Sequence, residues 1–209
     1  MDEYSSLKVP LVIYFRDVNQ SDPIVQGEMR NYIQALSDLP QIQQPPDFCW
    51  VIDLYDYMTG ASHKDMSEED AKQAATIVAA VQSENRTFTQ QLDMVLNIPT
   101  IRDVYGSDIV RDEDGNILTS RCYLSARHID LKSIEEQTTL LFNQREITAM
   151  YQPKERPNKN ELSFFAFNEL FYYWELVSGP KKSALKRLAT CGALTNIFLP
   201  VGLLSTQRR

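Results

Sequence analysis

The chain has 209 residues, of which 43% are hydrophobic and 23% are charged, and these ordinary globular values exclude a mainly disordered protein. Its 21 basic and 28 acidic residues give a net charge of −7, which argues against nucleic acid as a partner because such binding needs clustered cations. A mean hydropathy of −0.34 excludes a protein made largely of membrane spans.

The first predicted elements are a strand and a helix. Leu11–Phe15 is a short apolar, β-prone run, which is typical of a buried strand. Asp22 and Pro23 show the pattern of a helix N-cap followed by proline in the first turn, and Pro40 ends the helix. The residues with helical spacing that make its apolar face are Val25, Met29, Tyr32, Ile33 and Leu36.

A helical insertion is predicted over about residues 45–105. The aromatic-rich segment Phe48–Met58 fits a helix packed on a core or on a neighbouring surface. Ser67 begins a capping-box pattern before a helix over 68–81, and Thr87 begins another. The helix after Thr87 is expected to point four side chains inward: Phe88, Leu92, Val95 and Leu96.

The clearest turn signal is Asp-Gly at Asp114 and Gly115, which predicts a hairpin between Ile109–Arg111 and Ile117–His128. In the second strand, alternation places one set of side chains on one face: Leu118, Cys122, Leu124 and Ala126. The opposite face receives Thr119, Arg121, Tyr123, Ser125 and Arg127. The two arginines on that face fit either an anion site or pairs with acids on a neighbouring element.

Two more helices are predicted after the hairpin. Ser133 opens a capping-box helix that runs to about Met150, and a polar linker over 152–160 follows it. The less polar side of this helix is expected to be Ile134, Thr138, Leu141 and Ile147. Glu161–Ser178 is dense in aromatic residues and fits a helix that Gly-Pro then stops. The order of elements is most of a β-α-β-β-α-β plan with an insertion after the first helix, which predicts an α+β fold.

The residues that could carry chemistry form no pattern that an enzyme needs. His63 and His128 have no metal-ligand spacing to another His or Cys. The acidic cluster Asp108–Asp114 fits a solvated turn better than a calcium loop, because the later Glu of an EF-hand is missing. Asp53 and Asp56 fit a wet helix face better than a paired-acid site. We therefore expect no enzyme activity, no cofactor and no metal.

Cysteines and glycosylation triplets bear on the compartment. Of the three cysteines, Cys49 and Cys122 are a candidate disulfide pair and Cys191 is left over, although sequence alone does not decide the pairing. Asn19 and Asn85 each begin an N-x-[ST] triplet and are candidate glycosylation sites. Such triplets are common, so they favour an extracytoplasmic location only weakly.

The uncharged stretch Leu188–Leu204 has two interpretations: a buried C-terminal helix, or the beginning of a transmembrane helix that is cut short. Basic residues lie on both sides of it: Lys181, Lys182, Lys186, Arg187, Arg208 and Arg209. Tyr172–Trp174, just before the first basic cluster, are residue types that favour the membrane–water interface.

Four groups of residues support a family resemblance: Phe88–Asp93 with Val104–Gly106, Asp108–Ile117 with Ser120–Cys122, Asn143–Ile147, and Phe165–Glu175. With these groups, roughly Leu7–Leu204 resembles an extracytoplasmic loop domain of the resistance–nodulation–division superfamily. The most similar branch is the Patched, Niemann–Pick type C and Dispatched group, whose members carry a sterol-sensing domain.

The resemblance implies a ferredoxin-like extracytoplasmic domain over residues 7–180, and a basic juxtamembrane segment with a truncated transmembrane helix over 181–209. It places the domain on the extracellular or luminal side of a membrane. The implied partners are a lipid or sterol ligand and the remainder of a transporter, with its membrane helices and a paired extracytoplasmic domain. The candidate residues along a ligand path are Phe164, Phe167, Phe171, Tyr172 and Trp174. In the family, acidic residues inside membrane helices drive transport, so this chain is not expected to transport alone.

A second hypothesis remains open. The chain would then be a soluble α+β protein-interaction module in which Leu188–Leu204 is a plain buried helix. The two hypotheses differ in what removal of that segment would do. A module would lose part of its core and unfold, whereas a truncated membrane protein would become better behaved in solution.

Overall fold

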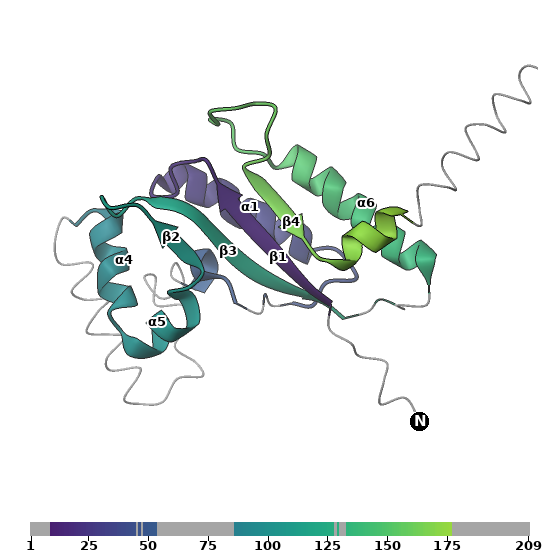
Figure 1. Cartoon of the computed structure of the whole chain (residues 1–209), viewed down its shortest axis with the longest axis horizontal. Helices are drawn as coiled ribbons and strands as arrows, with labels where there is room; N and C mark the ends of the chain where they lie inside the picture. Colours follow the sequence, from purple (N-terminus) through teal and green to yellow (C-terminus); the bar gives the residue numbers. More distant parts are fainter. Residues whose placement is uncertain are drawn as a thin grey trace, which may run out of the picture.

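The computed structural model describes residues 9–44, 46, 48–53, 86–127, 129 and 133–176. The fold is α+β, with a four-stranded antiparallel sheet in the order β2-β3-β1-β4 (Figure 1). The named elements are β1 (Val9–Arg16), α1 (Pro23–Ser37), α4 (Phe88–Leu96), α5 (Pro99–Tyr105), β2 (Ile109–Arg111), β3 (Ile117–Ala126), α6 (Ile134–Met150) and β4 (Phe164–Phe167).

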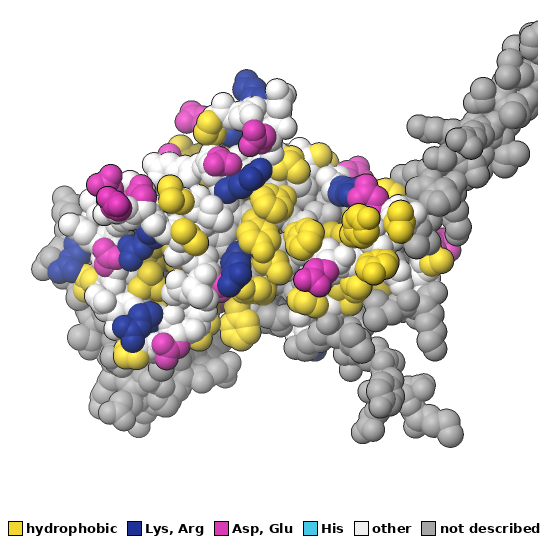
Figure 2. Space-filling view, in the orientation of Figure 1, with side chains coloured by type: hydrophobic (Ala, Val, Ile, Leu, Met, Phe, Trp, Pro, Cys, Tyr) yellow, Lys and Arg dark blue, Asp and Glu magenta, His cyan; other side chains and the backbone are white. Residues whose placement is uncertain are grey.

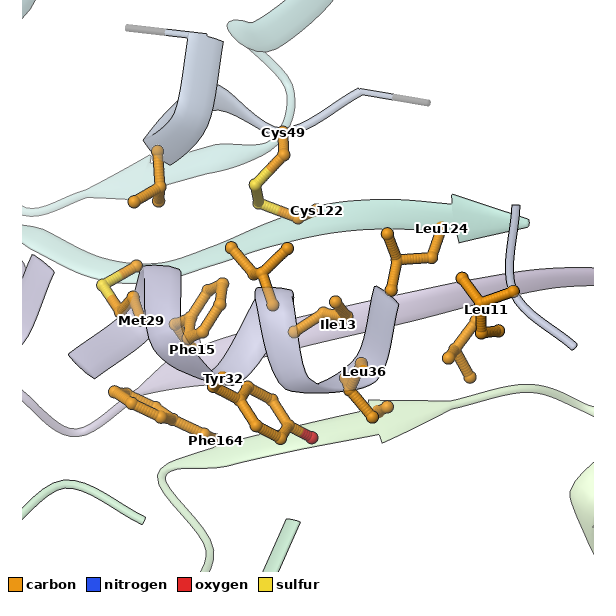
Figure 3. Close-up of a cluster of buried hydrophobic side chains, with 14 of the residues drawn as sticks. Leu11, Ile13, Phe15, Met29, Tyr32, Leu36, Cys49, Cys122, Leu124 and Phe164 are labelled. Atoms are coloured by element: carbon orange, nitrogen blue, oxygen red, sulfur yellow. A yellow bond between two sulfur atoms is a disulfide. The ribbon is translucent and has the colours of Figure 1, made fainter. Parts of the chain in front are cut away.

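The hydrophobic core lies between the sheet and the helices α1 and α6. Alternate residues of the central strand β1, namely Val9, Leu11, Ile13 and Phe15, are buried on this side, as the apolar run predicted. Figure 3 shows Leu11, Ile13 and Phe15 under α1, together with residues of β3 and β4. The Phe15 ring meets Tyr32 and Phe164 edge-on, with centroid distances of 6.3 and 5.0 Å. Such aromatic contacts add to the burial energy of the core.

The predicted helix starts at Asp22, Thr87 and Ser133 are confirmed. The Asp22 side chain accepts a hydrogen bond from the Ile24 N–H at 2.8 Å, and Pro23 occupies the first turn of α1. Thr87 and Gln90 form a reciprocal capping box at the start of α4. The five apolar residues predicted for one face of α1 are all buried. Caps and periodicity are local signals, which explains why sequence finds them.

The predicted hairpin is confirmed as β2 and β3, but Leu118 does not lie on the buried face. Gly115 adopts a φ of +84°, as the Asp-Gly turn requires. The register shifts between Val110 and Arg111, which pair with Thr119 and Ile117 and leave Leu118 as the extra residue of a β-bulge. The bulge breaks the alternation, so Leu118 is exposed while Ile117 is buried.

The predicted buried side of α6 needs correction. The helix begins after Ser133, as predicted, but Ile134 is exposed. The buried residues are Leu140, Leu141, Gln144 and Thr148, two of which are polar. The Thr148 hydroxyl bonds to the Tyr32 hydroxyl at 2.7 Å, and Gln144 donates to Thr148 at 3.1 Å. Burial raises the pKa of Tyr32, so its hydroxyl stays neutral within this network.

The prediction that Glu161–Ser178 is one helix is wrong. Its first part is the edge strand β4, which pairs with β1, and a helical segment over 170–176 follows. Within β4, Phe164 and Ala166 face the core while Phe165 and Phe167 face the other side. A run of four residues containing three phenylalanines fits either a helix or a strand locally, and the long-range pairing with β1 decides between them.

Phe48 also departs from its prediction, because it precedes the helical turn over 50–53 and makes an isolated bridge with Tyr123. The Tyr123 N–H donates to the Phe48 carbonyl at 2.8 Å, and the Gln43 N–H donates to the Ser125 carbonyl at 2.8 Å. Gln43 and Phe48 therefore each add a backbone hydrogen bond to the edge of β3 beyond the short strand β2. A disulfide joins Cys49 to Cys122 at a Cα–Cα distance of 4.5 Å, and this is the pair that the sequence left open.

Several predicted features lie outside the described residues. They include the helix over 68–81, Asn85, Asp56, both histidines and Leu188–Leu204. Across the described ranges, the structure contains no helix that is long and apolar enough to cross a membrane.

Candidate functional site

The sheet face opposite α1 carries two rows of large side chains. Residues paired across antiparallel strands share a face, so the pairings place Phe48, Tyr123, Val12 and Phe167 in one row. The next row contains Arg121, Tyr14 and Phe165. Figure 2 shows hydrophobic side chains gathered over β1 and β4 on this side of the molecule. We call these seven residues the open face.

The aromatic rings of the open face contact one another and two arginines. Tyr14 stacks on Phe165 with a centroid distance of 5.2 Å and an interplanar angle of 17°. The Arg16 guanidinium lies 5.4 Å from the centroid of Phe165, and that of Arg121 lies 5.6 Å from the centroid of Tyr123. Tyr14, Tyr123 and Phe165 are half-buried by these contacts, whereas Phe48 and Phe167 are exposed, so the face presents an apolar surface with cations at its border.

A buried acid sets the geometry of Arg121 and Tyr123. The Asp108 carboxylate accepts from Arg121 Nε at 2.6 Å and from the Tyr123 hydroxyl at 3.2 Å. The hydrogen bond to Asp108 raises the pKa of Arg121, and burial together with the Asp108 charge raises the pKa of Tyr123. The sequence left two interpretations open for Arg121, an anion site or a pair with an acid. The structure shows the pair, and the acid is Asp108 at the start of the hairpin.

A groove of about 620 Å³ adjoins the open face at β4. Its walls come from β4, from α6 and from the helical segment over 170–176. The apolar lining consists of Ala149, Leu162, Phe165, Ala166, Phe167, Phe171 and Tyr172. The polar lining consists of Arg16, Gln144, Arg145, Thr148 and Glu175. A volume of this size is within the range of small-molecule sites, and the predominance of apolar atoms favours an apolar ligand.

An ion pair connects two walls of the groove. Arg145 of α6 donates to both oxygens of Glu175, at 3.2 and 2.8 Å. The hydrogen bond from Arg145 lowers the pKa of Glu175, so the carboxylate stays charged well into the acid range. Both side chains are about half exposed, and the pair therefore positions the helical segment more than it stabilises the fold.

The five candidate path residues divide between the groove and the core. Phe167, Phe171 and Tyr172 line the groove, although only Phe167 and Tyr172 are substantially exposed, at 47% and 70%. Phe164 is fully buried under α1, and Trp174 is buried and packs against Phe171 at 5.3 Å. The structure thus brings three of the five together around one groove and places two in the core.

The outer edge of β4 is closed by two glutamine side chains. Gln152 donates to the Phe164 carbonyl at 2.6 Å and accepts from the Phe164 N–H at 3.3 Å. Gln144 donates to the Ala166 carbonyl at 3.1 Å. These amides take the place of a neighbouring strand, so the groove offers side chains rather than main-chain groups to a ligand.

The remaining candidate residues lie away from the groove. Asn19 is exposed in the loop between β1 and α1, and its side chain accepts from the Ser21 N–H at 3.1 Å. Asp112 accepts from the Asn116 N–H at 2.8 Å, and hydrogen bonds with Asn116 lower its pKa, as a solvated turn predicts. Asp53 accepts hydrogen bonds from Tyr105 and from the Cys49 N–H. Among the described residues no group of His, Cys, Asp and Glu is arranged to hold a metal ion.

Reasoning from sequence missed most of the open face. Tyr14, Tyr123 and Phe165 were seen only as members of predicted elements, because their proximity depends on β1 pairing with both β3 and β4. Alternation within each strand is the available signal, but the sequence over β4 predicts a helix, in which alternate residues do not share a face. Compared with known proteins, the chain matches no protein-family model and no curated protein.

Proposed function

We propose that this chain is the extracytoplasmic domain of a membrane lipid or sterol transporter or receptor, and that its groove lines the path of an apolar ligand. The observation that carries the proposal is the groove of about 620 Å³ at β4, lined mainly by aromatic and aliphatic side chains. Lipids and sterols are ligands whose surface is almost wholly apolar, so they match such a lining better than polar metabolites do.

The fold supports the same proposal. The order of the elements, with β1 between β3 and β4 in the sheet, fits the ferredoxin-like β-α-β-β-α-β plan that the family resemblance implies. Both helices of that plan lie on one side of the sheet, which leaves the open face available. In this proposal the open face meets the remainder of the transporter, namely its membrane helices and its paired extracytoplasmic domain.

The disulfide supports an extracellular or luminal position. Cys49 and Cys122 are fully buried, and their bond joins the beginning of the insertion to the central part of β3. Structural disulfides form and persist in oxidising compartments and are rare in the cytosol. Asn19, the acceptor residue of its triplet, is exposed, as glycosylation in such a compartment requires. In this proposal the chain does not transport alone, and transport requires the membrane part.

One observation favours a second function, that of a soluble protein-interaction module. The row formed by Phe48, Tyr123, Val12 and Phe167 runs across β3, β1 and β4, and Phe48 is 54% exposed. Exposed apolar patches of this kind commonly mark protein interfaces. This alternative needs no lipid, so a lipid-binding experiment separates the two.

The test is photocrosslinking of the full chain, in its oxidised form, with a photoactivatable cholesterol analogue. The variants Phe167→Asp and Tyr172→Asp each put a charge on the groove wall, where apolar burial contributes roughly 1.5 kcal/mol or more per side chain. We expect each to lower crosslinking by about tenfold or more at a subsaturating probe concentration.

The matched control is Ile24→Asp, which introduces the same charge at an exposed apolar residue of α1. We expect crosslinking of this variant to equal that of the unmodified chain. No labelling of the unmodified chain, or equal labelling of all three variants, would contradict the proposal and leave the interaction module as the better account.

A further inference from the structure

The lining of the groove includes a buried amide. Gln144 of α6 lines the groove, although the residue is only 3% exposed. Its nitrogen donates to the Thr148 hydroxyl at 3.1 Å and to the Ala166 carbonyl at 3.1 Å. A glutamine amide has two N–H groups, so these two bonds use both of them and leave no donor for a ligand.

The bond to β4 also fixes which way the Gln144 amide is turned. The Ala166 carbonyl is an acceptor, so it needs the nitrogen of the amide in front of it. Turning the amide over would place two oxygens against each other and would leave the carbonyl without a donor. The Oε1 atom of Gln144 therefore stays on the side of the amide away from Ala166.

This oxygen is an acceptor without a partner. In the part of the chain that the structure describes, no group donates a hydrogen bond to Gln144 Oε1. The unpartnered side-chain atoms that are sealed from solvent belong to other residues, namely Ser37, Gln41, Gln43 and Trp50. The Gln144 oxygen is therefore reached from outside, and the opening that this residue lines is the groove. An acceptor in so apolar a place is costly unless a donor meets it.

The charged groups of the lining decide what kind of donor fits. Arg145 bonds to Glu175 at 2.8 Å, and Arg16 donates from Nε to the Leu162 carbonyl at 3.2 Å. Two guanidinium groups against one carboxylate make the lining unfavourable for a ligand amine, which would carry a positive charge at neutral pH. A neutral hydroxyl meets the Gln144 oxygen without that repulsion.

We propose that Gln144 is the residue that determines the specificity of the groove, and that its Oε1 atom accepts a hydrogen bond from a hydroxyl group of the ligand. The inference rests on the proposed function, because it concerns the ligand of the same groove. It adds the chemistry of that ligand, which is an otherwise apolar alcohol. The ketone of the same skeleton would place oxygen against oxygen, and sites that bond a hydroxyl discriminate strongly against such analogues.

The experiment compares cholestanol with cholestanone, which share one skeleton and differ only in a hydroxyl or a carbonyl. Each competes with the photoactivatable cholesterol analogue for the full, oxidised chain, and the ratio of their inhibitory concentrations is measured. Gln144→Met keeps the length of the side chain and removes the amide. Gln152→Met is the matched control, because Gln152 also bonds to β4 but does not line the groove. The ratio compares two ligands on one preparation, so a partial loss of folded protein does not change it.

With the unmodified chain we expect cholestanol to compete about tenfold better than cholestanone, because only the alcohol supplies a donor to the buried oxygen. The ratio should fall to about one in Gln144→Met and stay unchanged in Gln152→Met.

Equal competition by the two compounds with the unmodified chain would overturn the inference, and this comparison stands whether or not Gln144→Met folds. A ratio that persisted in Gln144→Met, or that was lost in both variants, would overturn the role of Gln144 in particular. In each of these cases the groove would still bind the probe. If neither compound competed with the probe, the proposed function itself would be refuted, and the inference with it.

Discussion

At the scale of single residues, neighbours within one aromatic run have opposite roles. Phe164 is fully buried, where it packs against Phe15 and stacks on Tyr32 at 5.8 Å, whereas Tyr172 is mostly exposed at the groove. Residue type alone does not separate these roles, because phenylalanine and tyrosine are common both in cores and in binding sites. The difference comes from which face of a strand or helix each side chain occupies.

This difference gives a stability prediction. Phe164→Ala leaves a cavity under α1 and should lower the free energy of unfolding by about 3–5 kcal/mol. Tyr172→Ala removes an exposed side chain and should change that energy by less than about 0.5 kcal/mol. Urea unfolding of the full chain, followed by circular dichroism, measures both. A comparable loss in the two variants would show that Tyr172 also belongs to the core.

Residues that cap helices were predictable, whereas Leu118 was not. Asp22 and Thr87 act on N–H groups two or three residues away, so their role is written in a short stretch of sequence. Leu118 is exposed because a bulge shifts the register with β2, and alternation in β3 alone gives no sign of it. Predictions that depend on local signals are therefore confirmed. The prediction for Leu118 is wrong because it depends on how two strands pair.

At the scale of elements, α6 shows why a buried helix face was misjudged. Because Gln144 and Thr148 are polar, the sequence places them on the surface of the helix. They are buried instead, because Gln144 hydrogen-bonds to the Ala166 carbonyl and Thr148 to the Tyr32 hydroxyl. A buried polar residue with partners on other elements cannot be recognised until those partners are placed. The same reasoning applies to Gln152, which sequence put in a linker and which bonds to β4.

The contact between α6 and the helical segment over 170–176 gives a prediction about pH. Arg145 holds the pKa of Glu175 below its ordinary value in the folded chain, so folding favours the ionised carboxylate. The resulting stability is present above the ordinary glutamate pKa of about 4.3 and is lost as the pH falls through the lower, folded pKa. Glu175→Gln should therefore be slightly less stable than the unmodified chain at pH 7 and equally stable in strong acid.

Urea unfolding of both chains across the acid range measures this difference. Glu169→Gln is the control, because Glu169 is an exposed acid two residues after β4. Its difference from the unmodified chain should not change over the same pH range. A stability gap for Glu175→Gln that persisted in strong acid would contradict the role assigned to the ion pair.

At the scale of the whole molecule, the predicted order of elements is enough to give the fold class. It is not enough to give the complete sheet, because one strand is missing from the prediction. The strand, helix, hairpin and helix were all predicted, which is enough for an α+β fold. The fourth strand was missed because it is only four residues long and depends on β1 as its partner. The open face and the groove involve that strand, so they could not be predicted as a site.

The disulfide also acts on the whole molecule, because its cysteines are 73 residues apart in sequence. Closing so long a loop restricts the unfolded chain, and the loop-entropy relation gives a stabilisation of about 4 kcal/mol. The double variant Cys49→Ala/Cys122→Ala should lose roughly that much unfolding free energy, measured by urea unfolding under oxidising conditions. The unmodified chain in the presence of a reductant should match the double variant, and unchanged stability in both would refute the assignment.

The two glutamine side chains that close the edge of β4 have a consequence for how this domain acquires partners. Strand addition needs a row of free N–H and C=O groups, and Gln144 and Gln152 already occupy such groups on Phe164 and Ala166. Recognition at this end of the sheet must therefore depend on side chains. A surface that binds through its side chains selects a ligand by shape and apolarity rather than by a main-chain hydrogen-bond pattern. Substitutions of a few β4 side chains that point away from the core can therefore change the ligand without altering the strand.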